Sequence, residues 1–464
     1  MIRDTDLRER AAEWLLREDI VEKDYVLGWL LWGIATQPEL NTTWVFKGGT
    51  CLKKCYFETY RFSEDLDFTV RDGGRMQPQE LLRIFAEVAA RIYEGSGIEI
   101  PAQDLRFEAS ATGAYVEGRL YYRGPRNPRG DLPRIKLDLT SDEVLVQPPV
   151  LRPIAHPYPD ELPGPPQVYC YAFEEIFAEK LRAMGERGRP RDLYDIINLY
   201  RRPDLRGAPD LIRRVLQAKC EHKGIAVPAM MSIEASAYRD ELEAEWANML
   251  AHQLPQLPPF ETFWSELAGL FAWLEGREPA PAPLQAVPVG ADVEETWRPP
   301  PTVWRWGAGV PLEAVRFAGV NRLCIDLGYQ GSTRRVEPYS LRRTRDGHIL
   351  LFARRVDSGQ IRSYRVDRIQ RIEVTIQPFV PVYEIDVWGI APPLQRSATP
   401  PKASRRGRRR YSARSPGLRY VVQCTYCGKR FTRRDTRLQK HKMPDASGFD
   451  CPGRTGYIVD TVHG

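Results

Sequence analysis

A proline-rich stretch from Arg277 to Pro301 sets the strongest limit on how this chain can fold. It carries seven prolines and no apolar periodicity, and proline fixes φ and removes a backbone donor, so neither a helix nor a central strand is expected to continue through it. A second break, from about Ala391 to Gly417, combines prolines with a basic run. At roughly 100–200 residues per domain, 464 residues should form about three units. We expect domains at 1–276, 302–388 and 419–464, with linkers at 277–301 and 389–418.

The first unit is expected to be a mixed α/β (α+β) domain with a helical second half. Helical spacing of apolar residues covers 5–38, 78–94, 172–186, 190–200 and 208–220. Short strands are indicated at 44–46, 65–70, 116–122 and 134–139. Strand patterns at 323–326, 349–353, 363–366 and 372–377 predict that the second unit is a small all-β barrel of the SH3-like kind. The third unit should be a small zinc-binding module.

Composition argues against a membrane protein. The longest strongly apolar stretch, Tyr25 to Ala35, is shorter than the roughly 20 residues that a membrane-spanning helix needs, so it should form a buried helix. The first residues also lack the apolar core of a signal peptide. We therefore expect a cytoplasmic protein without a membrane partner, whose cysteines are thiols or metal ligands. Five scattered cysteines are expected to be small buried residues: Cys51, Cys55, Cys170, Cys220 and Cys324.

Two features place phosphate-binding and acidic groups close together. Gly48, Gly49 and Thr50 stand where a short strand passes into a helix, so that backbone N–H groups can approach a phosphate, although a plain tight turn is the alternative. About fifteen residues later, Asp65 and Asp67 are two apart in a strand and project from one face. Adjacent carboxylates repel each other unless a cation lies between them, and their hard oxygens suit Mg²⁺ or Mn²⁺, which can bridge the oxygens of a nucleoside triphosphate.

Two further segments supply charged partners. Lys136 and Asp138 share one strand face, which would make Asp138 a further metal ligand or base and bring Lys136 near phosphate; an exposed strand face is the alternative. Asp192 and Asp195 are three apart and so share a helix face, and Lys180 lies in the preceding helix. A solvated amphipathic hairpin would show the same pattern.

These four segments, in this order, resemble the AbiEii/AbiGii-type toxins of the DNA-polymerase-β-like nucleotidyltransferase superfamily. The resemblance covers roughly residues 20–200 and is strongest at 47–50 and 61–68. It implies a metal-dependent nucleotidyltransferase with the glycine turn and Ser63 near the triphosphate and with Asp65, Asp67 and Asp138 as metal ligands. It also implies that Lys180 contacts phosphate, and that Asp192 or Asp195 orients Lys180 or the acceptor.

Proteins of this family act as toxins or in phage defence, and some transfer nucleotides to the acceptor end of transfer RNA. The resemblance therefore implies RNA as the favoured acceptor and an antitoxin as a protein partner. The sequence after residue 276 is not part of the minimal toxin.

The second unit resembles a WYL domain, a small barrel of bacterial defence regulators. The resemblance rests on 335–339, 349–353 and 362–369, although the position that gives the domain its name reads Ile349-Leu350-Leu351-Phe352 here. It implies a domain that senses nucleic acid or a nucleotide. Four side chains could form its basic pocket or simply an ordinary basic surface: Tyr339, Arg354, Arg365 and Arg368.

The C-terminal region carries a predicted structural zinc site. Cys424, Cys427, His441 and Cys451 are separated by two, thirteen and nine residues, and two thiols on a tight turn with a returning imidazole and thiol can form a closed tetrahedral Zn²⁺ site.

The same region is strongly basic. Eight basic residues and no acidic ones lie between Lys402 and Arg419, and such a run releases counterions from a phosphate backbone. RNA is the favoured nucleic acid and DNA the alternative. The predicted contacts are Arg405, Arg406, Arg408, Arg409, Arg410, Arg430, Arg433 and Arg434.

Two other functions remain open from the sequence. The first is a nucleic-acid-binding defence regulator whose polymerase-like domain is not catalytic; the presence of Gly48, Asp67 and Lys180 argues against it. The second is a protein-kinase-like enzyme that transfers a phosphoryl group to a protein hydroxyl, because both reactions need a metal and a bound triphosphate.

Overall fold

The chain forms two compact units, Met1–Pro393 and Leu394–Gly464. The computed structural model describes all residues except 58, 72–73, 127–129, 165, 203–207, 236–237, 280–281, 283, 295–304, 307–309, 388–418, 425–428, 434–437, 443–450, 452–455 and 463–464.

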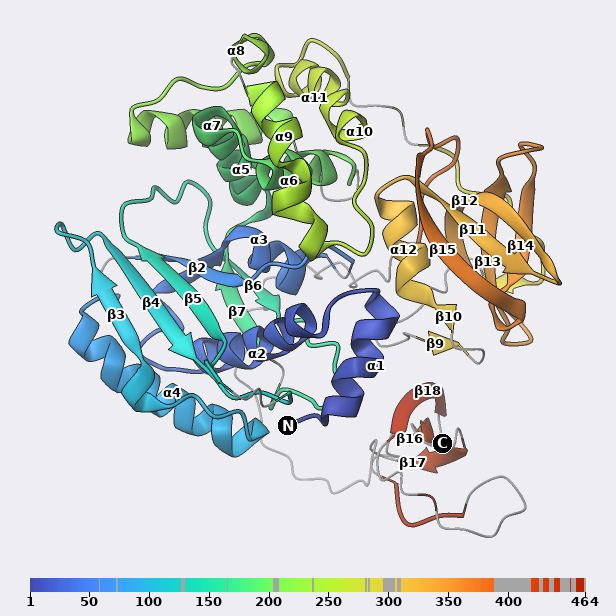
Figure 1. The fold of residues 1–464 in the computed structure, drawn as a ribbon, viewed down its shortest axis with the longest axis horizontal. Helices are drawn as coiled ribbons and strands as arrows, with labels where there is room; N and C mark the ends of the chain where they lie inside the picture. Colours follow the sequence, from blue (N-terminus) through green and yellow to red (C-terminus); the bar gives the residue numbers. More distant parts are fainter. Residues whose placement is uncertain are drawn as a thin grey trace, which may run out of the picture. The chain divides into compact units, whose positions relative to one another are not determined.

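A mixed sheet organises the first part of the larger unit. Seven strands of its described residues lie in the order β3-β4-β5-β2-β1-β7-β6 (Figure 1). Strand β2 pairs in parallel with β5 and antiparallel with β1. The strands are β1 Trp44–Lys47, β2 Asp65–Val70, β3 Arg106–Ala109, β4 Tyr115–Tyr121, β5 Arg134–Thr140, β6 Val150–Pro153 and β7 Gln167–Cys170. In β2, Leu66 and Phe68 are buried in the core, so the strand's alternation turns the aspartates to the other face.

Helices from the first hundred residues pack against this sheet. From Tyr25 onward, helix α2 contains only apolar residues and glycine, with Trp29 and Leu30 each 1% exposed, which confirms the predicted buried helix at Tyr25–Ala35. Helix α4 lies along β3, where the Phe85 and Phe107 rings meet with centroids 5.1 Å apart. The helices are α1 Asp4–Trp14, α2 Glu18–Ala35, α3 Gly48–Cys51, a π-helix at Leu52–Tyr56, α4 Pro78–Ser96 and a 3-10 helix at Ala102–Asp104.

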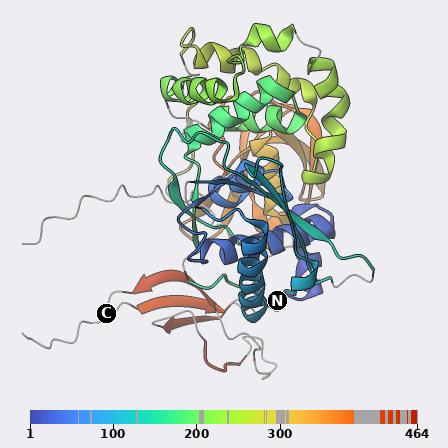
Figure 2. The same ribbon diagram turned by 90° about the vertical axis from the view of Figure 1, so that its left-hand side faces the viewer.

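A second group of helices follows the sheet, as predicted (Figures 1 and 2, green). Proline occupies the first turn of α6 and α7, where its missing N–H has no helical partner to lose. Helix α7 ends at Gly224, whose φ of 65° is left-handed. The helices are α5 Phe173–Arg187, α6 Pro190–Tyr200, α7 Pro209–Lys223, α8 Met230–Glu234, α9 Tyr238–Leu250, a 3-10 helix at Ala251–Gln253, α10 Phe260–Trp264 and α11 Leu267–Leu274.

An antiparallel sheet with one helix completes the larger unit. Its strands lie in the order β14-β13-β12-β11-β15, and β8 pairs with β12. The elements are β8 Val293–Glu294, β9 Arg305–Trp306, β10 Val310–Pro311, α12 Leu312–Val320, β11 Leu323–Tyr329, β12 Ser332–Thr344, β13 Ile349–Arg355, β14 Ile361–Arg365, a 3-10 helix at Val366–Arg368 and β15 Ile369–Pro378. Beyond α12, the Asn321 side chain accepts a hydrogen bond of 2.9 Å from the Tyr194 hydroxyl of α6.

The smaller unit contains a three-stranded antiparallel sheet in its described residues, in the order β17-β16-β18. Its strands are β16 Arg419–Cys424, β17 Arg430–Arg433 and β18 Gly456–Val462. Val422, Cys424, Leu438 and Cys451 form its small buried core.

The predicted fold class is confirmed, with two local differences. The region 5–38, predicted as one helical stretch, is two helices, because Leu15 adopts a left-handed conformation with φ of 55°. The predicted domain at 302–388 was expected to contain only strands. The structure adds a helix, α12, which is buried along its length. A short helix that is buried on all sides, with Glu313 and Arg316 among its buried residues, lacks the one-sided apolar pattern that reveals an amphipathic helix. Among the described residues, none of the helices combines the length and apolar character needed to cross a lipid bilayer.

Candidate active site

Two glycines form a tight passage from β1 into α3. Gly48 has a left-handed φ of 82°, and a Cβ atom there would overlap the Asp67 carboxylate. A Cβ at Gly49 would lie 2.5 Å from Arg61 Nη2 and 3.1 Å from Ser63 Oγ. Thr50 fixes the turn from the other side by donating its hydroxyl to the backbone oxygen of Asp65 at 2.5 Å. The structure therefore brings the predicted glycine turn, Ser63 and the two aspartates together, and only glycine fits at position 48.

Strand register arranges the charged side chains in two rows. Lys47 of β1 stands beside Asp67 of β2, and Asp67 stands beside Asp138 of β5. In the next row, Asp65 stands beside Lys136. Because residues in register on neighbouring strands project from the same face, the three predicted metal-binding carboxylates lie on one face of the sheet.

The carboxylates of β2 hold their protons more tightly than ordinary aspartates. Burial raises the pKa of Asp67 to about 6, with the Asp138 and Asp65 charges adding to the effect and Lys47 opposing it. Burial, followed by the Asp138 charge, also raises the pKa of Asp65. A divalent cation would relieve this repulsion, and the donor set of carboxylate oxygens fits Mg²⁺ or Mn²⁺.

Asp138 is held in place by two neighbours. Lys136 Nζ lies 2.9 Å from Asp138 Oδ2 and 3.3 Å from Glu117 of β4. The Tyr115 hydroxyl also donates to Asp138, and burial together with this bond raises the pKa of Tyr115 to about 12. Lys136 thus lies beside the carboxylates, partnered within the sheet.

On the helical side, Lys180 lies between two buried aspartates. Its Nζ is 2.8 Å from Asp195 Oδ2 and 3.4 Å from Asp192 Oδ1, and both aspartates are completely buried. Asp192 also accepts two hydrogen bonds from Arg187, at 2.9 and 3.1 Å. The Lys180 charge is among those that lower the pKa of Asp67, so this ammonium group lies near enough to the sheet carboxylates for its charge to act on them.

The structure places at the site several cations that sequence reasoning missed. Arg61, 2% exposed, forms a bidentate ion pair with Asp195. Burial and the Arg61 charge lower the pKa of Arg191, which has Asp65 among the charges around it. Lys23 lies 2.6 Å from Glu64. The position of Arg61 inside the strongest motif was a usable signal, whereas nothing local marked Lys23.

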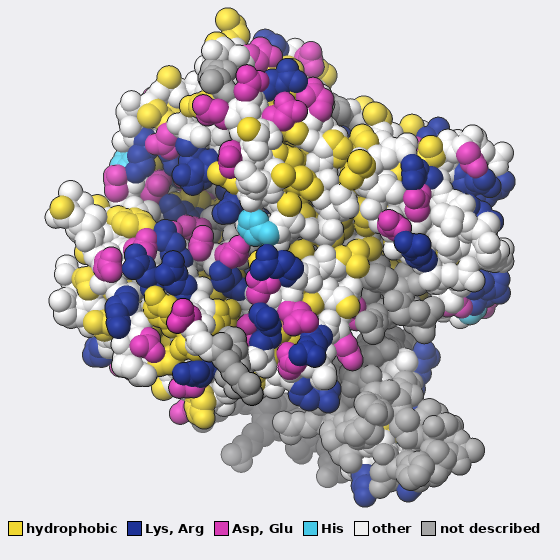
Figure 3. Space-filling model, viewed as in Figure 1, with side chains coloured by type: hydrophobic (Ala, Val, Ile, Leu, Met, Phe, Trp, Pro, Cys, Tyr) yellow, Lys and Arg dark blue, Asp and Glu magenta, His cyan; other side chains and the backbone are white. Residues whose placement is uncertain are grey.

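A cavity of about 340 Å³ opens beside Asp65. It is lined by Lys23, Asp65, Glu117, Arg119, Arg134 and Lys136. A larger cavity of about 950 Å³ shares Lys23 and Arg134 with it and is also lined by Arg106, Tyr121 and Arg126. Figure 3, which has the same view as Figure 1, shows Lys and Arg side chains interspersed with Asp and Glu over the region of the seven-stranded sheet. The cavity beside Asp65 thus shares lining residues with a larger cavity that is also lined by several cationic side chains.

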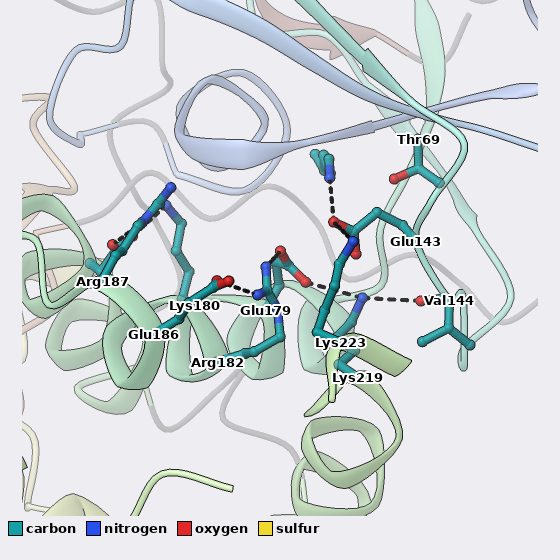
Figure 4. Close-up of polar contacts among 12 residues, drawn as sticks. Thr69, Glu143, Val144, Glu179, Lys180, Arg182, Glu186, Arg187, Lys219 and Lys223 are labelled. Carbon is teal, nitrogen blue, oxygen red and sulfur yellow. Dashed lines mark hydrogen bonds and ion pairs between the residues drawn. The ribbon is translucent and has the colours of Figure 1, made fainter. Parts of the chain in front are cut away.

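A network of ion pairs joins the glycine turn to α5 and α7 (Figure 4). Glu143, in the loop after β5, lies 3.4 Å from Lys47 and 4.0 Å from Lys223. Lys219 of α7, 1% exposed, lies 3.3 Å from Glu179 of α5. Because buried ions need opposite charges close by, this network fixes the helices against the strand that carries Lys47.

The four residues of the expected WYL-type pocket are mostly engaged with other groups. Tyr339 is completely buried and donates to Glu337 at 2.9 Å. Arg354 also pairs with Glu337, at 2.8 Å, and Arg365 pairs with Asp367 at 2.5 Å. Both arginine charges therefore have acidic partners within the barrel.

The smaller unit brings three predicted zinc ligands together. One ligand atom each from Cys424, His441 and Cys451 lies within 4.8 Å of the others, and the two sulfur atoms are 3.7 Å apart. His441 Nδ1 donates to the Gln439 backbone oxygen at 2.8 Å, which fixes the orientation of the ring. These donors fit Zn²⁺; the fourth predicted ligand, Cys427, lies outside the described residues.

Two of the predicted nucleic-acid contacts belong to β17. Arg430 is exposed and donates to the Gln423 side chain at 3.1 Å, and Arg433 lies over the Phe431 ring at 5.9 Å. The other predicted contacts lie outside the described residues: Arg405, Arg406, Arg408, Arg409, Arg410 and Arg434.

Comparison with protein families gives two matches. The sequence model of the AbiEii family, a nucleotidyl transferase toxin of type IV toxin–antitoxin systems, matches residues 29–266, just over half of the chain. The WYL domain model matches residues 312–374. No curated protein sequence matches significantly.

Solved structures of nucleotidyltransferases are also similar to the chain. MenT4, a nucleotidyltransferase toxin from Mycobacterium tuberculosis H37Rv, aligns with a TM-score of 0.40 and 20% identity, over 60% of this chain and 91% of MenT4. A putative nucleotidyltransferase from Helicobacter pylori aligns with a TM-score of 0.38 and 18% identity, over 56% of this chain and 97% of that protein.

Proposed function

Because the chain belongs to the AbiEii family of nucleotidyltransferase toxins, we propose that its glycine turn and its sheet carboxylates transfer a nucleotide from a nucleoside triphosphate to RNA. The chain is a nucleotidyltransferase and also contains a WYL domain. One observation carries the assignment of residues: the register sets Lys47, Asp67 and Asp138 side by side, with Gly48 packed against the Asp67 carboxylate.

The glycine turn is proposed to bind the triphosphate. Backbone N–H groups at Gly48 and Gly49 can approach phosphate oxygens because no Cβ shields them. The Thr50 hydroxyl is used to fix the turn, and Ser63 Oγ, beside Gly49, can donate to the phosphates. Lys180 supplies positive charge from the helical side, held by Asp195 and Asp192, and Lys136 supplies it from the sheet.

The three sheet carboxylates are proposed as metal ligands. Asp65, Asp67 and Asp138 would hold Mg²⁺ or Mn²⁺, which when bound neutralises negative charge on the triphosphate. Their fit to a cation is supported by the raised pKa of Asp65 and Asp67, which burial causes first and neighbouring carboxylate charges increase, because a bound cation stabilises the ionised carboxylates against both effects.

In the proposed reaction, an acceptor hydroxyl oxygen forms a bond to the α-phosphorus and the bond to the β-phosphate oxygen breaks, so that pyrophosphate leaves. Asp138, positioned by Lys136 and Tyr115, accepts the hydroxyl proton. Lys180 offsets the charge that develops on the leaving pyrophosphate.

RNA is the proposed acceptor, with DNA as the alternative. The cavities beside Asp65 present Lys23, Arg119 and Arg134, and cations along a groove favour a phosphate backbone. The basic C-terminal region would add contacts, held by Zn²⁺ on Cys424, Cys427, His441 and Cys451. An antitoxin protein and a role in phage defence are proposed from the family alone.

The test uses pure full-length protein, Mg²⁺, total RNA and each nucleoside triphosphate labelled at the α or γ position. We expect α-label on RNA, and its loss in Asp65→Ala and Asp67→Ala variants. Asp357→Asn, which removes an exposed carboxylate in the hairpin after β13, serves as the matched control and should keep the activity.

The label pattern separates the alternatives. Label from the γ position on protein would replace nucleotidyl transfer by phosphoryl transfer. Absence of any label under these conditions would favour a non-catalytic regulator. A labelled product that persists in both aspartate variants would overturn the assignment of residues.

A further inference from the structure

Three of the five scattered cysteines meet in the core of the nucleotidyltransferase domain. One sulfur atom each from Cys51, Cys55 and Cys170 lies within 4.8 Å of the other two. Cys51 and Cys170 are completely buried, and Cys55 is 6% exposed. Each was expected to be an isolated small core residue; the structure instead makes them one thiol cluster.

The local fold explains why the three thiols converge. Cys51 ends α3, and Cys55 follows in the π-helix Leu52–Tyr56. Cys170 ends β7, which pairs in parallel with β1 just before the glycine turn. A π-helix is rare and is frequently found at functional sites. Here it lies directly after the turn that packs against Asp67.

The geometry of the cluster suits a soft metal ion. A Zn–S bond of about 2.3 Å places the sulfur atoms of a tetrahedral site about 3.8 Å apart. Because the three sulfur atoms lie within 4.8 Å of one another, they need to close by at most about 1 Å. Thiolates select ions such as Zn²⁺ and Cu⁺ over hard cations. Among the described residues, the group contains no His, Asp or Glu, and the Tyr56 hydroxyl lies 4.0 Å from Cys170 Sγ.

One cation, the Arg152 guanidinium, lies beside the cluster. The Arg152 guanidinium lies over the Tyr56 ring at 4.2 Å and donates to the Cys55 backbone oxygen at 2.8 Å. Burial raises the pKa of Cys51 and Cys55. Although burial opposes it, hydrogen bonds from these two thiols lower the pKa of Cys170. The half-buried cation of Arg152 would also offset part of the negative charge of a metal–thiolate group.

We propose that Cys51, Cys55 and Cys170 bind one thiophilic d10 metal ion, Zn²⁺ or Cu⁺, as a structural site behind the glycine turn. The thiols lose their protons to solvent as sulfur–metal bonds form, and no electron is transferred. Since the site is closed, the ion enters as the domain folds. It ties α3, which begins with Gly48 and Gly49, to the end of β7.

The test measures bound metal rather than activity. The parent protein is the full chain with Cys424→Ala and Cys451→Ala, which removes two thiols of the C-terminal group. It is produced with added Zn²⁺ or Cu⁺, passed through a chelating resin and analysed for each element. We expect about one ion per chain, with the element found distinguishing zinc from copper, and a Co²⁺–thiolate absorption band after refolding with Co²⁺.

Single substitutions locate the ion. Cys51→Ala and Cys170→Ala should lose it, while Cys220→Ala and Cys324→Ala, which remove equally buried thiols outside the cluster, should retain it. A folded parent protein that carries neither metal nor the Co²⁺ band would overturn the proposal, as would retention of the ion in Cys51→Ala and Cys170→Ala. Should these variants fail to fold, the parent's metal content and Co²⁺ band still decide.

Discussion

The Arg61 guanidinium and the Asp195 carboxylate form a buried bidentate ion pair that joins the two sides of the active site. Arg61 Nε and Nη2 each lie 2.7 Å from an Asp195 oxygen, and Lys180 Nζ lies 2.8 Å from the same carboxylate. Although burial opposes ionisation, the charges of Arg61 and Lys180 hold the pKa of Asp195 well below its usual value. The Asp195 carboxylate therefore positions two cations, Arg61 beside the glycine turn and Lys180 on the helical side of the site.

Replacing Arg61 by Met should destabilise the protein strongly. The substitution leaves Asp195 as a buried charge with one cation fewer, and breaking a buried pair in this way costs about 3–5 kcal/mol. Urea unfolding followed by tryptophan fluorescence measures the change. Arg355→Met removes an arginine whose ion pair with Asp357 is exposed to solvent, so its unfolding midpoint should stay close to that of the unaltered protein. Equal, small effects of the two substitutions would show that the Arg61–Asp195 pair contributes little.

Replacing Gly48 by Ala should weaken both stability and triphosphate binding. An L-residue at a left-handed φ costs about 1–2 kcal/mol, and here the added Cβ also overlaps Asp67. Gly224→Ala is the matched control, because Gly224 has a φ of 65° but no atom within 4 Å of the place that a Cβ would take. Chemical denaturation and titration with a nucleoside triphosphate compare the two. If Gly48→Ala costs no more than Gly224→Ala and binds triphosphate normally, close packing at Gly48 is not required.

The metal-free protein should lose stability as the pH rises from about 4 through 6. The pKa of Asp67 is about 6 in the folded chain and about 4 in an unfolded one, so the folded state binds the proton more tightly, and the free-energy cost of ionising Asp67 in the folded chain is fully present above pH 6. Asp67→Asn should remove this loss of stability between about pH 4 and 6. It should stabilise the metal-free protein at pH 7 by about 1–3 kcal/mol. Unfolding midpoints in EDTA between pH 4 and 8 test this.

Added Mn²⁺ should make the unaltered protein more stable as the pH rises, since a cation favours the ionised carboxylate. It should leave the stability of Asp67→Asn nearly unchanged. Asp357→Asn, at an exposed position, should follow the unaltered protein throughout. A pH profile of Asp67→Asn that matches the unaltered protein would contradict the raised pKa of Asp67.

The elements that carry the site could be predicted because their signals are local. The alternation of Asp65 to Val70 gives the bounds of β2, and Pro190 marks the first residue of α6. The same local reasoning correctly put Asp65 and Asp67 on one strand face. It could not rank Asp192 against Asp195, because both stand on one helix face. The structure shows that each contacts Lys180 and that Asp195 alone also binds Arg61.

The remaining relationships depend on strand order and on distant segments. Asp138 lies beside Asp67 only because β5 is inserted in parallel next to β2, a pairing that no pattern within either strand specifies. Cys170 joins Cys51 from 119 positions along the chain. Spacing rules for metal ligands find thiols in short motifs, such as the C-terminal one, but they do not detect a site that the sheet topology assembles.

The C-terminal unit should release one zinc ion when its ligands are removed. Cys424, His441 and Cys451 already lie within 4.8 Å of one another, and a closed structural site contributes directly to folding. We expect His441→Ala and Cys451→Ala each to lower the zinc content by one ion per chain. Each should also expose the backbone of β16 to hydrogen exchange while leaving exchange in β2 and β5 unchanged. Metal analysis and hydrogen exchange measured by mass spectrometry test both effects.

His252→Ala is the matched control for His441→Ala, because the His252 ring pairs with Glu64 at 3.3 Å and lies in the other unit. It should leave the zinc content unchanged. A zinc content that is unchanged in both ligand variants would place this ion elsewhere in the chain. Faster hydrogen exchange in β2 and β5 as well would mean that the C-terminal site also stabilises the nucleotidyltransferase domain. That result would contradict the expectation that the zinc ion stabilises only the small C-terminal sheet.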